Sequence, residues 1–313
     1  MKSPAIYDQY KGKKVLLTGG RGFIGSRLKK SLADTGAQVY SLDSRPAGER
    51  DPREIVCDLR DGVSVREVVE SVSPEMVFHL AAAVDRNQAP EMLRPMLETN
   101  LFGSLNLFEA LRGKSYCRAV VVSGTAEEYG RAVPPFLESY HEDPVGPYSF
   151  SKVCVSHLTR LFFNVYGLPV MVLRPTLAYG PGQEQVMFIP SLLGALSRGE
   201  KFAMTAGEQT RDFIYVDDLV KAYMLAGLSS GGFGEIYNIG SGAPCRIADL
   251  ARMAAKLFKK EHLLDIGAKD YRSAEIMDYR VDISKARKTF GWSPETGLEA
   301  GLRLTLEGCA DAK

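Results

Sequence analysis

The chain has 313 residues, of which 45% are hydrophobic and 25% charged, and its 39 basic residues nearly balance 38 acidic ones. This composition is typical of one large α/β domain, or of a nucleotide-binding domain with a smaller companion. It excludes a small disulfide-stapled scaffold. Because the basic residues are spread among acidic ones, the sequence also argues against a nucleic-acid partner.

Other features of the sequence indicate where in the cell the protein is found and whether it binds a metal. No apolar run approaches the roughly 18 residues of a membrane span, and the first residues lack the apolar core of a signal peptide. The five cysteines are odd in number and never form a C-x-x-C pair, which is typical of reduced thiols. We therefore expect a cytoplasmic protein that has no membrane segment. The four histidines do not have metal-ligand spacing, so no metal site is expected.

Short apolar runs alternate with amphipathic segments over the first 175 residues. This alternation predicts an α/β fold with a doubly wound parallel sheet of the Rossmann type, covered by helices on both faces. The predicted strands are Lys14–Thr18, Gln38–Leu42, Glu54–Cys57, Met76–Leu80, Ala119–Ser123 and Pro169–Arg174. The predicted helices are Gly22–Ala33, Val63–Val72, Glu91–Leu111 and Tyr148–Tyr166.

Beyond Pro175 the pattern changes to shorter elements separated by loops rich in glycine and proline. We expect a dinucleotide-binding domain at 1–175, with return segments near 205–240, and a mainly substrate-binding region at 176–313 that covers the carboxyl ends of the strands. The helices near 91–111 and 148–166 carry apolar stripes, which are either buried or pair with a second subunit. We expect a homodimer through these helices. The stripes are Leu97, Leu101, Leu105 and Phe108, and Val155, Leu158, Phe162 and Tyr166.

A glycine-rich loop follows the first predicted strand. Its glycines stand three apart, at Gly19, Gly22 and Gly25, with Phe23 and Ile24 between the last two. Glycine lets a backbone approach a pyrophosphate, which then lies at the amino end of the next helix. Such a loop alone is a weak signal. With a strand before it, an amphipathic helix after it and an acid at the end of the next strand, it predicts a dinucleotide site.

That acid is Asp43, whose carboxylate accepts hydrogen bonds from ribose hydroxyls and repels a 2′-phosphate, so NAD is the expected cofactor. Arg21 and Arg45 leave NADP as the alternative, because either guanidinium would suit a 2′-phosphate. Two further segments are placed to contact the cofactor. They are Asp58 and Leu59 after the third strand, and Leu80, Ala81 and Ala82 after the fourth, whose small side chains fit either a cofactor or plain packing.

Tyr148 and Lys152 stand four apart in a predicted helix, which places them on one face. Using tyrosine as a base near neutral pH requires roughly 4 kcal/mol of phenolate stabilisation, because its ordinary pKa is near 10. An ammonium ~4 Å away at an effective dielectric constant of ~20 supplies about that amount. Thr125, at the end of an earlier strand, is able to hydrogen-bond the same substrate oxygen. We expect these three residues to be catalytic.

Motifs along nearly the whole chain resemble the extended short-chain dehydrogenase/reductase family, in particular its nucleotide-sugar epimerases, dehydratases and 4-keto reductases. The resemblance implies a nucleotide-sugar substrate and NAD chemistry at C4. In that family the third catalytic residue lies five positions before the glycine of a Tyr-Gly pair, and counting back from Gly130 gives Thr125. The motifs are the TGGRGFIG loop, Asp43, Asp58, His79–Ala82, Asn100, Thr125–Gly130, Tyr148 with Lys152, Arg174–Pro175, Tyr179–Gly182, Arg211–Asp218, Tyr237–Gly242 and Gly291–Pro294.

The resemblance also implies binding residues. Asn100 falls among the cofactor-binding positions, Arg211 matches a position that pairs with the substrate diphosphate, and Arg272 lies where a second phosphate-binding arginine is often found. Arg272 is alternatively a surface ion-pair partner. Leu177 departs from the family, many members of which carry a substrate-contacting asparagine there, and so leaves the exact sugar nucleotide open.

Three reactions fit this pattern. A 4-epimerase or a 4-keto reductase needs the three catalytic residues and a nicotinamide cofactor, whereas a 4,6-dehydratase needs an additional base and acid. Glu127 occupies the position of the dehydratases' base, but Ala126 stands where one type of dehydratase has its acid. Glu127 and Glu128 are alternatively capping or loop residues that face water. A non-catalytic dinucleotide-binding scaffold is disfavoured, because such proteins typically lose the tyrosine, the lysine or the glycine loop.

Overall fold

Seven parallel strands form the frame of the molecule in the computed structural model, which describes residues 8–46, 51–85, 87–271 and 275–310. The sheet has the order β11-β6-β5-β4-β1-β2-β3. This confirms the doubly wound parallel sheet that the sequence predicts. The strands are β1 (Lys14–Thr18), β2 (Gln38–Asp43), β3 (Glu54–Val56), β4 (Met76–His79), β5 (Ala119–Ser123), β6 (Val170–Pro175) and β11 (Ile236–Ile239).

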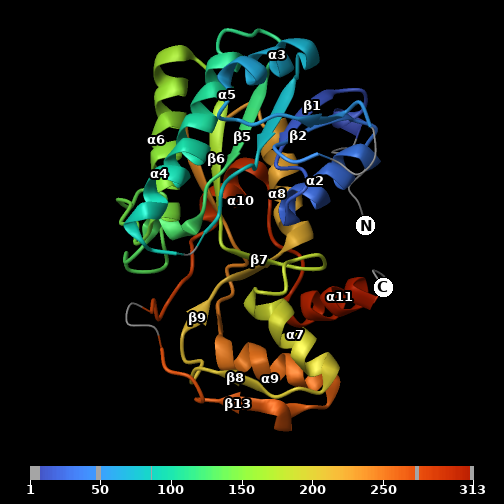
Figure 1. Cartoon of the computed structure of the whole chain (residues 1–313), viewed down its shortest axis with the longest axis vertical. Helices are drawn as coiled ribbons and strands as arrows, with labels where there is room; N and C mark the ends of the chain where they lie inside the picture. Colours follow the sequence, from blue (N-terminus) through green and yellow to red (C-terminus); the bar gives the residue numbers. More distant parts are fainter. Residues whose placement is uncertain (1–7, 47–50, 86, 272–274, 311–313) are drawn as a thin grey trace.

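Helices cover both faces of the sheet (Figure 1). On one face lie α3 (Gly62–Val72), α5 (Gly103–Leu111) and α6 (Pro147–Tyr166), and on the other α2 (Phe23–Asp34), α8 (Val216–Leu228) and α10 (Ser284–Phe290). Alternate strand residues feed the two cores. Leu16 packs toward the first set of helices, whereas its neighbours Val15 and Leu17 pack toward the second. Burial on both faces explains why the strands are apolar runs without polar alternation.

The sheet reverses its winding between β1 and β4. From β1 the chain continues outward through β2 and β3, and it then returns to β4 on the other side and continues through β5 and β6. In open sheets of this kind, ligands bind in the crevice at the carboxyl ends of the strands where the order reverses. The glycine loop, the end of β4 and the end of β5 all lie along this edge.

The seventh strand, β11, is absent from the strands predicted from sequence. It contains Asn238, whose side chain is fully buried, donates to the Phe136 carbonyl and accepts from the Tyr129 hydroxyl. A polar residue inside a four-residue strand interrupts the apolar run on which the prediction depends.

The predicted helix Glu91–Leu111 is a helix of changing pitch. It begins as η2, a 3₁₀ turn (Pro90–Met92), continues as α4 (Leu93–Met96), widens into η3, a π-helix (Leu97–Phe102), and resumes as α5. The π segment contains the buried Asn100. Insertions of this kind are common near functional sites.

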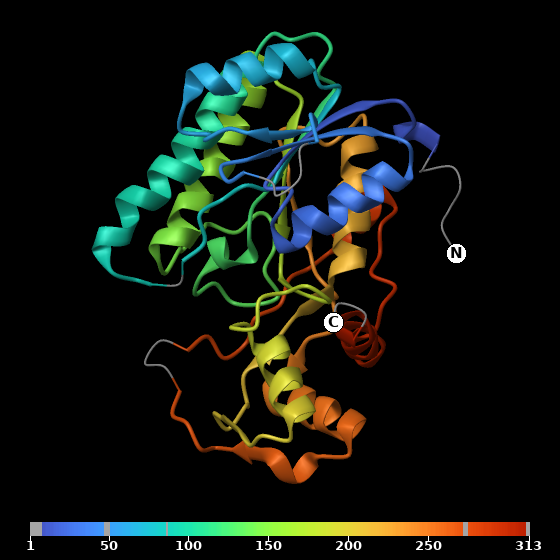
Figure 2. The same cartoon turned by 45° about the vertical axis from the view of Figure 1, so that its right-hand side comes forward.

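The shorter elements beyond Pro175 build a second lobe (Figures 1 and 2). Its core joins Leu192 and Leu196 of α7 to Leu250 and Ala254 of α9 and Leu302 of α11. The elements are β7 (Leu177–Tyr179), α7 (Phe188–Arg198), β8 (Phe202–Met204), β9 (Thr210–Arg211), β10 (Phe213–Tyr215), β12 (Cys245–Arg246), α9 (Ile247–Phe258), η5 (Glu261–Leu263), β13 (Leu264–Ile266) and α11 (Leu298–Ala310). Two more 3₁₀ turns are η1 (Asp8–Tyr10) and η4 (Ala126–Tyr129).

The chain returns from the second lobe to the sheet. Both α8 and β11 lie within the predicted return segment 205–240, and α10, beyond that segment, also packs against α8 and β11. Among the described residues, no helix combines the length and the hydrophobicity needed to cross a bilayer.

Candidate active site

The glycine loop packs so closely that side chains are excluded from it. Gly19 has φ of +74°, and a Cβ built there would lie 2.7 Å from the Ala81 backbone nitrogen. Cβ atoms at Gly20 and Gly25 would overlap the Ser41 hydroxyl and the Gly19 carbonyl oxygen. Gly22 caps α2 without a side-chain hydrogen bond, which leaves the first amides of that helix for an anion. The loop therefore fits the dinucleotide pyrophosphate predicted for it.

Asp43 ends β2 beside this loop. Its carboxylate accepts hydrogen bonds from the Ser41 hydroxyl at 2.9 Å and from the Arg21 amide at 3.4 Å. Burial raises the pKa of Asp43, and these hydrogen bonds oppose the rise. The carboxylate therefore lies beside the glycine loop, held by its neighbours, where the sequence predicts a ribose contact.

The other predicted cofactor residues take different positions. Asp58 is paired with the exposed Arg60 at 2.6 Å, whereas the Leu59 side chain is buried in the core. The side chain of Asn100 is hydrogen-bonded within the protein. It accepts from the Ala83 amide and donates to the Ala83 carbonyl and to the Ser151 hydroxyl. Asn100 therefore ties the segment after β4 to α6. Phe23, Ile24, Leu80, Ala81 and Ala82 are all partly exposed along the crevice edge.

His79 is a residue to which the sequence analysis assigned no role, although it begins one of the recognised motifs. It is fully buried and lies 2.7 Å from the Thr18 hydroxyl and 2.9 Å from the Ser104 hydroxyl. Burial lowers the pKa of His79 to about 3. Because Thr18 also accepts from the Ala81 amide, a neutral imidazole links the ends of β1 and β4 where the cofactor crevice opens.

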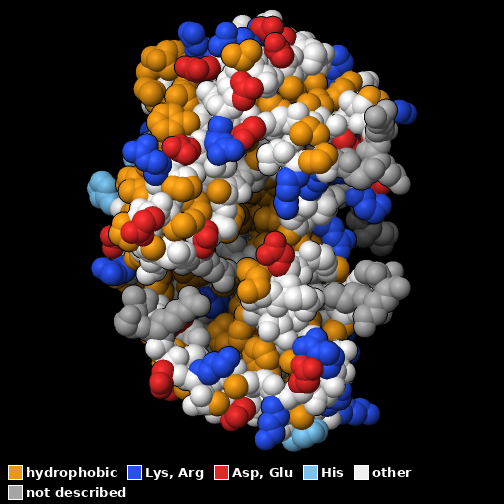
Figure 3. Space-filling model, viewed as in Figure 1, with side chains coloured by type: hydrophobic (Ala, Val, Ile, Leu, Met, Phe, Trp, Pro, Cys, Tyr) orange, Lys and Arg blue, Asp and Glu red, His pale blue; other side chains and the backbone are white. Residues whose placement is uncertain are grey.

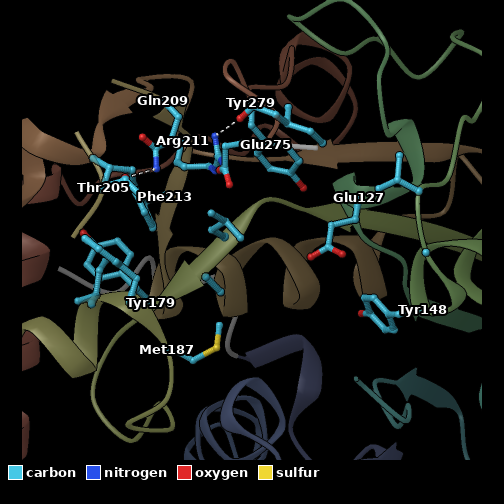
Figure 4. Close-up of a pocket in the computed structure, with 18 of the residues that line it drawn as sticks. Glu127, Tyr148, Tyr179, Met187, Thr205, Gln209, Arg211, Phe213, Glu275 and Tyr279 are labelled. Atoms are coloured by element: carbon cyan, nitrogen blue, oxygen red, sulfur yellow. Dashed lines mark hydrogen bonds and ion pairs between the residues drawn. The ribbon is translucent and has the colours of Figure 1, made fainter. Parts of the chain in front are cut away.

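The residues predicted to be catalytic come from the end of β5 and the start of α6. Pro147 and Gly146 begin α6, and the first turn presents Tyr148 to a cleft that also exposes Glu127 (Figure 4). Lys152 lies one turn further into the helix and is 4% exposed. Its ammonium donates to the Ser123 carbonyl at 2.8 Å. Burial lowers the pKa of Lys152 to about 8, and the nearby carboxylate of Glu128 opposes this.

Thr125 follows β5 and caps the short η4 turn. Its hydroxyl accepts from the Glu127 amide at 3.2 Å, while its own amide donates to the Glu128 carboxylate at 2.9 Å. This reciprocal cap fixes the threonine backbone, and the side chain is 8% exposed. The chain thus brings Thr125 and Lys152 to the same end of β5, next to the first turn of α6.

A buried charge network lies behind these residues. Glu128 is fully buried, and it accepts from the Ser156 hydroxyl at 2.6 Å and from Arg174 at 2.6 and 2.9 Å. Arg174 is also fully buried, and it reaches Glu142 at 2.7 Å and lies over the Tyr129 ring. Sequence reasoning missed this network. The one signal for it was Arg174, a charged residue near the end of the otherwise apolar strand β6.

The cleft between the two lobes has a volume of about 730 Å³. It extends from Tyr148 and Glu127 at one end, past Arg211, to Thr205 and Tyr179 (Figure 4), and the space-filling view shows hydrophobic side chains in the hollow between the lobes (Figure 3). Leu177 lines its wall, at the position where the sequence departs from the family pattern. Among residues that sequence reasoning missed, the wall also includes Met187, Phe188, Phe202 and Tyr279.

Arg211 extends from β9 into the cleft with its orientation fixed. Its guanidinium donates to the Thr210 and Ile276 carbonyls at 2.7 Å each and pairs with Glu275. Burial lowers the pKa of Arg211, opposed by Glu275. The second predicted phosphate contact, Arg272, lies outside the described residues.

No group of three or more candidate metal ligands occurs in the part of the chain that the structure describes. The residues predicted to be catalytic lie next to the crevice predicted for the dinucleotide. This arrangement agrees with the comparisons with known proteins, in which the NAD dependent epimerase/dehydratase family model matches residues 15–240. The chain belongs to this family.

Several known proteins are similar to this member of the family. A relative from Sinorhizobium fredii, named as a probable dTDP-glucose 4,6-dehydratase, is 30% identical, covering 94% of this chain and 92% of its own. A structure of UDP-glucose 4-epimerase with UDP-glucose from Thermotoga maritima has a TM-score of 0.85 at 29% identity, covering 95% of this chain and 99% of its own. RMD from Pseudomonas aeruginosa, complexed with NADPH, has a TM-score of 0.80 at 26% identity, covering 96% and 100%. The family assignment makes the chain an enzyme that uses a nicotinamide dinucleotide.

Proposed function

We propose that this enzyme performs redox chemistry at C4 of a nucleotide-diphosphate sugar, as a 4-epimerase or a 4-keto-sugar reductase. The observation that carries the proposal is the shared cleft. Tyr148 opens into it one helical turn from the buried Lys152, and Arg211 faces it from the other lobe. The relatives include proteins named as a UDP-glucose 4-epimerase and a probable dTDP-glucose 4,6-dehydratase, and these names support this substrate class.

The catalytic step assigns a task to each residue. A nicotinamide held at the glycine loop and Asp43 would supply or accept the hydride at the sugar carbon. Tyr148 accepts the hydroxyl proton when that carbon is oxidised and returns it when the carbon is reduced. Lys152 stabilises the phenolate as a cation whose position is fixed by the Ser123 carbonyl. Thr125 hydrogen-bonds the sugar oxygen and holds it against the phenol.

Substrate binding uses the opposite end of the cleft. The guanidinium of Arg211 is held by two carbonyls and Glu275, so it presents a preorganised cation to the diphosphate. The apolar wall that includes Phe188 and Phe202 suits a nucleobase. The cofactor-binding roles of the glycine loop and Asp43 belong to the same proposal.

A specific observation favours a second candidate, the 4,6-dehydratase. Glu127 lines the cleft next to Tyr148, where a base beside C5 of the sugar would act (Figure 4). The buried Ala126, however, supplies no acid beside it to protonate the leaving hydroxyl. For this reason we rank the dehydratase second.

One experiment separates these reactions. Purified protein is incubated with UDP- and dTDP-hexoses and their 4-keto forms, with NAD alone and with added NADH or NADPH, while mass and reduced-cofactor absorbance are followed. Isomerisation without net cofactor change supports the epimerase, stoichiometric oxidation of NADH or NADPH supports the reductase, and loss of one water supports the dehydratase. No conversion of any substrate would contradict an enzyme acting at C4 and favour the scaffold.

The homodimer and the cytoplasmic location belong to this proposal as predictions. Of the predicted stripe on α6, Val155 and Phe162 pack into the sheet core. A different face of α6 exposes Phe150, Leu161 and Val165, at 41%, 47% and 61%. We therefore propose this second face as the subunit contact. Leu161→Glu should convert a dimer to a monomer in analytical ultracentrifugation, and an unchanged sedimentation coefficient would contradict it.

A further inference from the structure

The choice between NAD and NADP depends on charges beside Asp43 that sequence reasoning did not combine. The family model is named for NAD, yet a structural neighbour carries NADPH, so membership of the family alone leaves the choice open. Glu54 begins β3 and pairs in register with Ser41, whose hydroxyl donates to Asp43. A second carboxylate therefore lies next to the predicted ribose contact.

Glu54 pairs with two cations of this region, whereas the exposed Arg45 is not among its ion-pair partners. The Lys29 ammonium lies 2.7 Å from one of its carboxylate oxygens, and the Arg21 guanidinium lies 3.7 Å from the other. The Glu54 side chain is only 14% exposed. The guanidinium of Arg21 also donates to the Arg45 carbonyl, which further restrains its direction.

Arg21 nevertheless retains hydrogen-bonding capacity. Its second terminal nitrogen, the one facing Glu54, is buried and makes no hydrogen bond. A 2′-phosphate carries a charge of about −1.5 to −2 and is bound best by guanidinium or ammonium groups that are free to hydrogen-bond it. In this chain Glu54 already pairs with Arg21 and Lys29, which leaves Arg45, among the described residues, as the unopposed arginine beside the loop, and Asp43 adds a second negative charge.

We propose that Glu54 determines cofactor specificity, because it neutralises Arg21 and Lys29 and so denies NADP the cations that its 2′-phosphate needs. Asp43 attracts the ribose hydroxyls of NAD, and Glu54 disfavours binding of the 2′-phosphate of NADP. If the Glu54 charge is lost, the Asp43 carboxylate alone faces Arg21 and Lys29. This balance of charge favours binding of the 2′-phosphate of NADP. The inference rests on the dinucleotide site of the proposed function and is independent of the reaction at C4.

The test measures binding of each dinucleotide to the full chain by isothermal titration calorimetry. In Glu54→Gln we expect the ratio of the NADP to the NAD dissociation constant to fall by about tenfold or more, since two cations become available. Adding Arg21→Met to that variant should restore most of the original ratio. As a matched control, Glu75→Gln breaks a similar Lys13–Glu75 pair of 2.8 Å outside the crevice and should leave the ratio unchanged.

Two outcomes would overturn the proposal. The first is an unchanged ratio in a Glu54→Gln protein that still binds NAD and keeps its melting temperature. The second applies even if that variant does not fold: Arg21→Met alone should leave the NADP affinity of the natural chain nearly unchanged, and a large loss would show that Arg21 already reads the 2′-phosphate. If the natural chain binds neither dinucleotide, the dinucleotide site itself is wrong, which is a separate result.

Discussion

The two ends of the cleft are built in different ways. At the catalytic end, Thr125 and Lys152 are at most 8% exposed and are fixed by β5, the η4 cap and a long helix. At the other end, Arg211 lies on a two-residue strand, held by loop carbonyls. Reaction chemistry needs positions fixed within fractions of an ångström, whereas recognition tolerates variable loops on a common frame. The comparison predicts that substitutions at the first end change turnover and those at the second change affinity.

The largest effect is expected from Tyr148→Phe, which removes the proposed proton acceptor at the catalytic end. Turnover should fall by about 10³-fold, the range typical of a general base. NAD affinity, measured by titration calorimetry, should be unchanged because the glycine loop is untouched. Turnover within a few-fold of the natural enzyme would remove the assigned base.

Glu128→Gln tests whether the buried network positions the catalytic residues. The variant keeps the shape but leaves Arg174 with a weaker partner, so we expect a loss of about 3 kcal/mol in unfolding free energy. We also expect kcat to fall by about tenfold, with little change in KM, because the Thr125 cap loosens. Glu142 contacts Arg174 but not Thr125, so Glu142→Gln serves as the control. An equal kcat loss in both variants would assign Glu128 a purely structural role.

Arg211→Leu probes the recognition end. We expect KM for the nucleotide sugar to rise by about tenfold with kcat nearly unchanged, the pattern of an interaction made equally in the ground and transition states. Arg246→Leu, an exposed position on the neighbouring strand β12, is the control. A fall in kcat without a change in KM would mean that Arg211 acts in the chemical step.

The smallest effect concerns acid stability. With a folded pKa of about 3, His79 stays neutral while the unfolded chain binds a proton below its ordinary value of 6.5. Stability is therefore lost as pH falls from about 6.5 toward 3, by about 2 kcal/mol between pH 7 and 5. Urea unfolding of His79→Gln should show a pH dependence smaller by that amount. The exposed His157→Gln should behave like the natural chain, and identical curves for all three would contradict the assignment.

The difference between the two ends also explains what the sequence could predict. The inner strands β1, β4, β5 and β6 were identifiable because they are buried on both faces and therefore apolar, and the glycine loop because close packing excludes other residues at Gly19 and Gly25. The pair Tyr148 and Lys152 followed from helical spacing. The Glu128–Arg174 pair and the ion pairs of Glu54 join residues far apart in sequence, and no local periodicity encodes them. The cleft walls contributed by the second lobe also depend on tertiary packing, so the sequence did not predict them.

The chemistry proposed for the catalytic end depends on the buried Lys152 ammonium, which we expect to let the Tyr148 phenol ionise near neutral pH. Ultraviolet difference spectra of the NAD-saturated protein over a pH titration measure this ionisation. At about pH 8, below the ordinary tyrosine range, we predict phenolate absorbance in the natural enzyme that is absent in Tyr148→Phe and largely lost in Lys152→Met. Superimposable spectra for the natural enzyme and Tyr148→Phe up to about pH 9 would contradict the account.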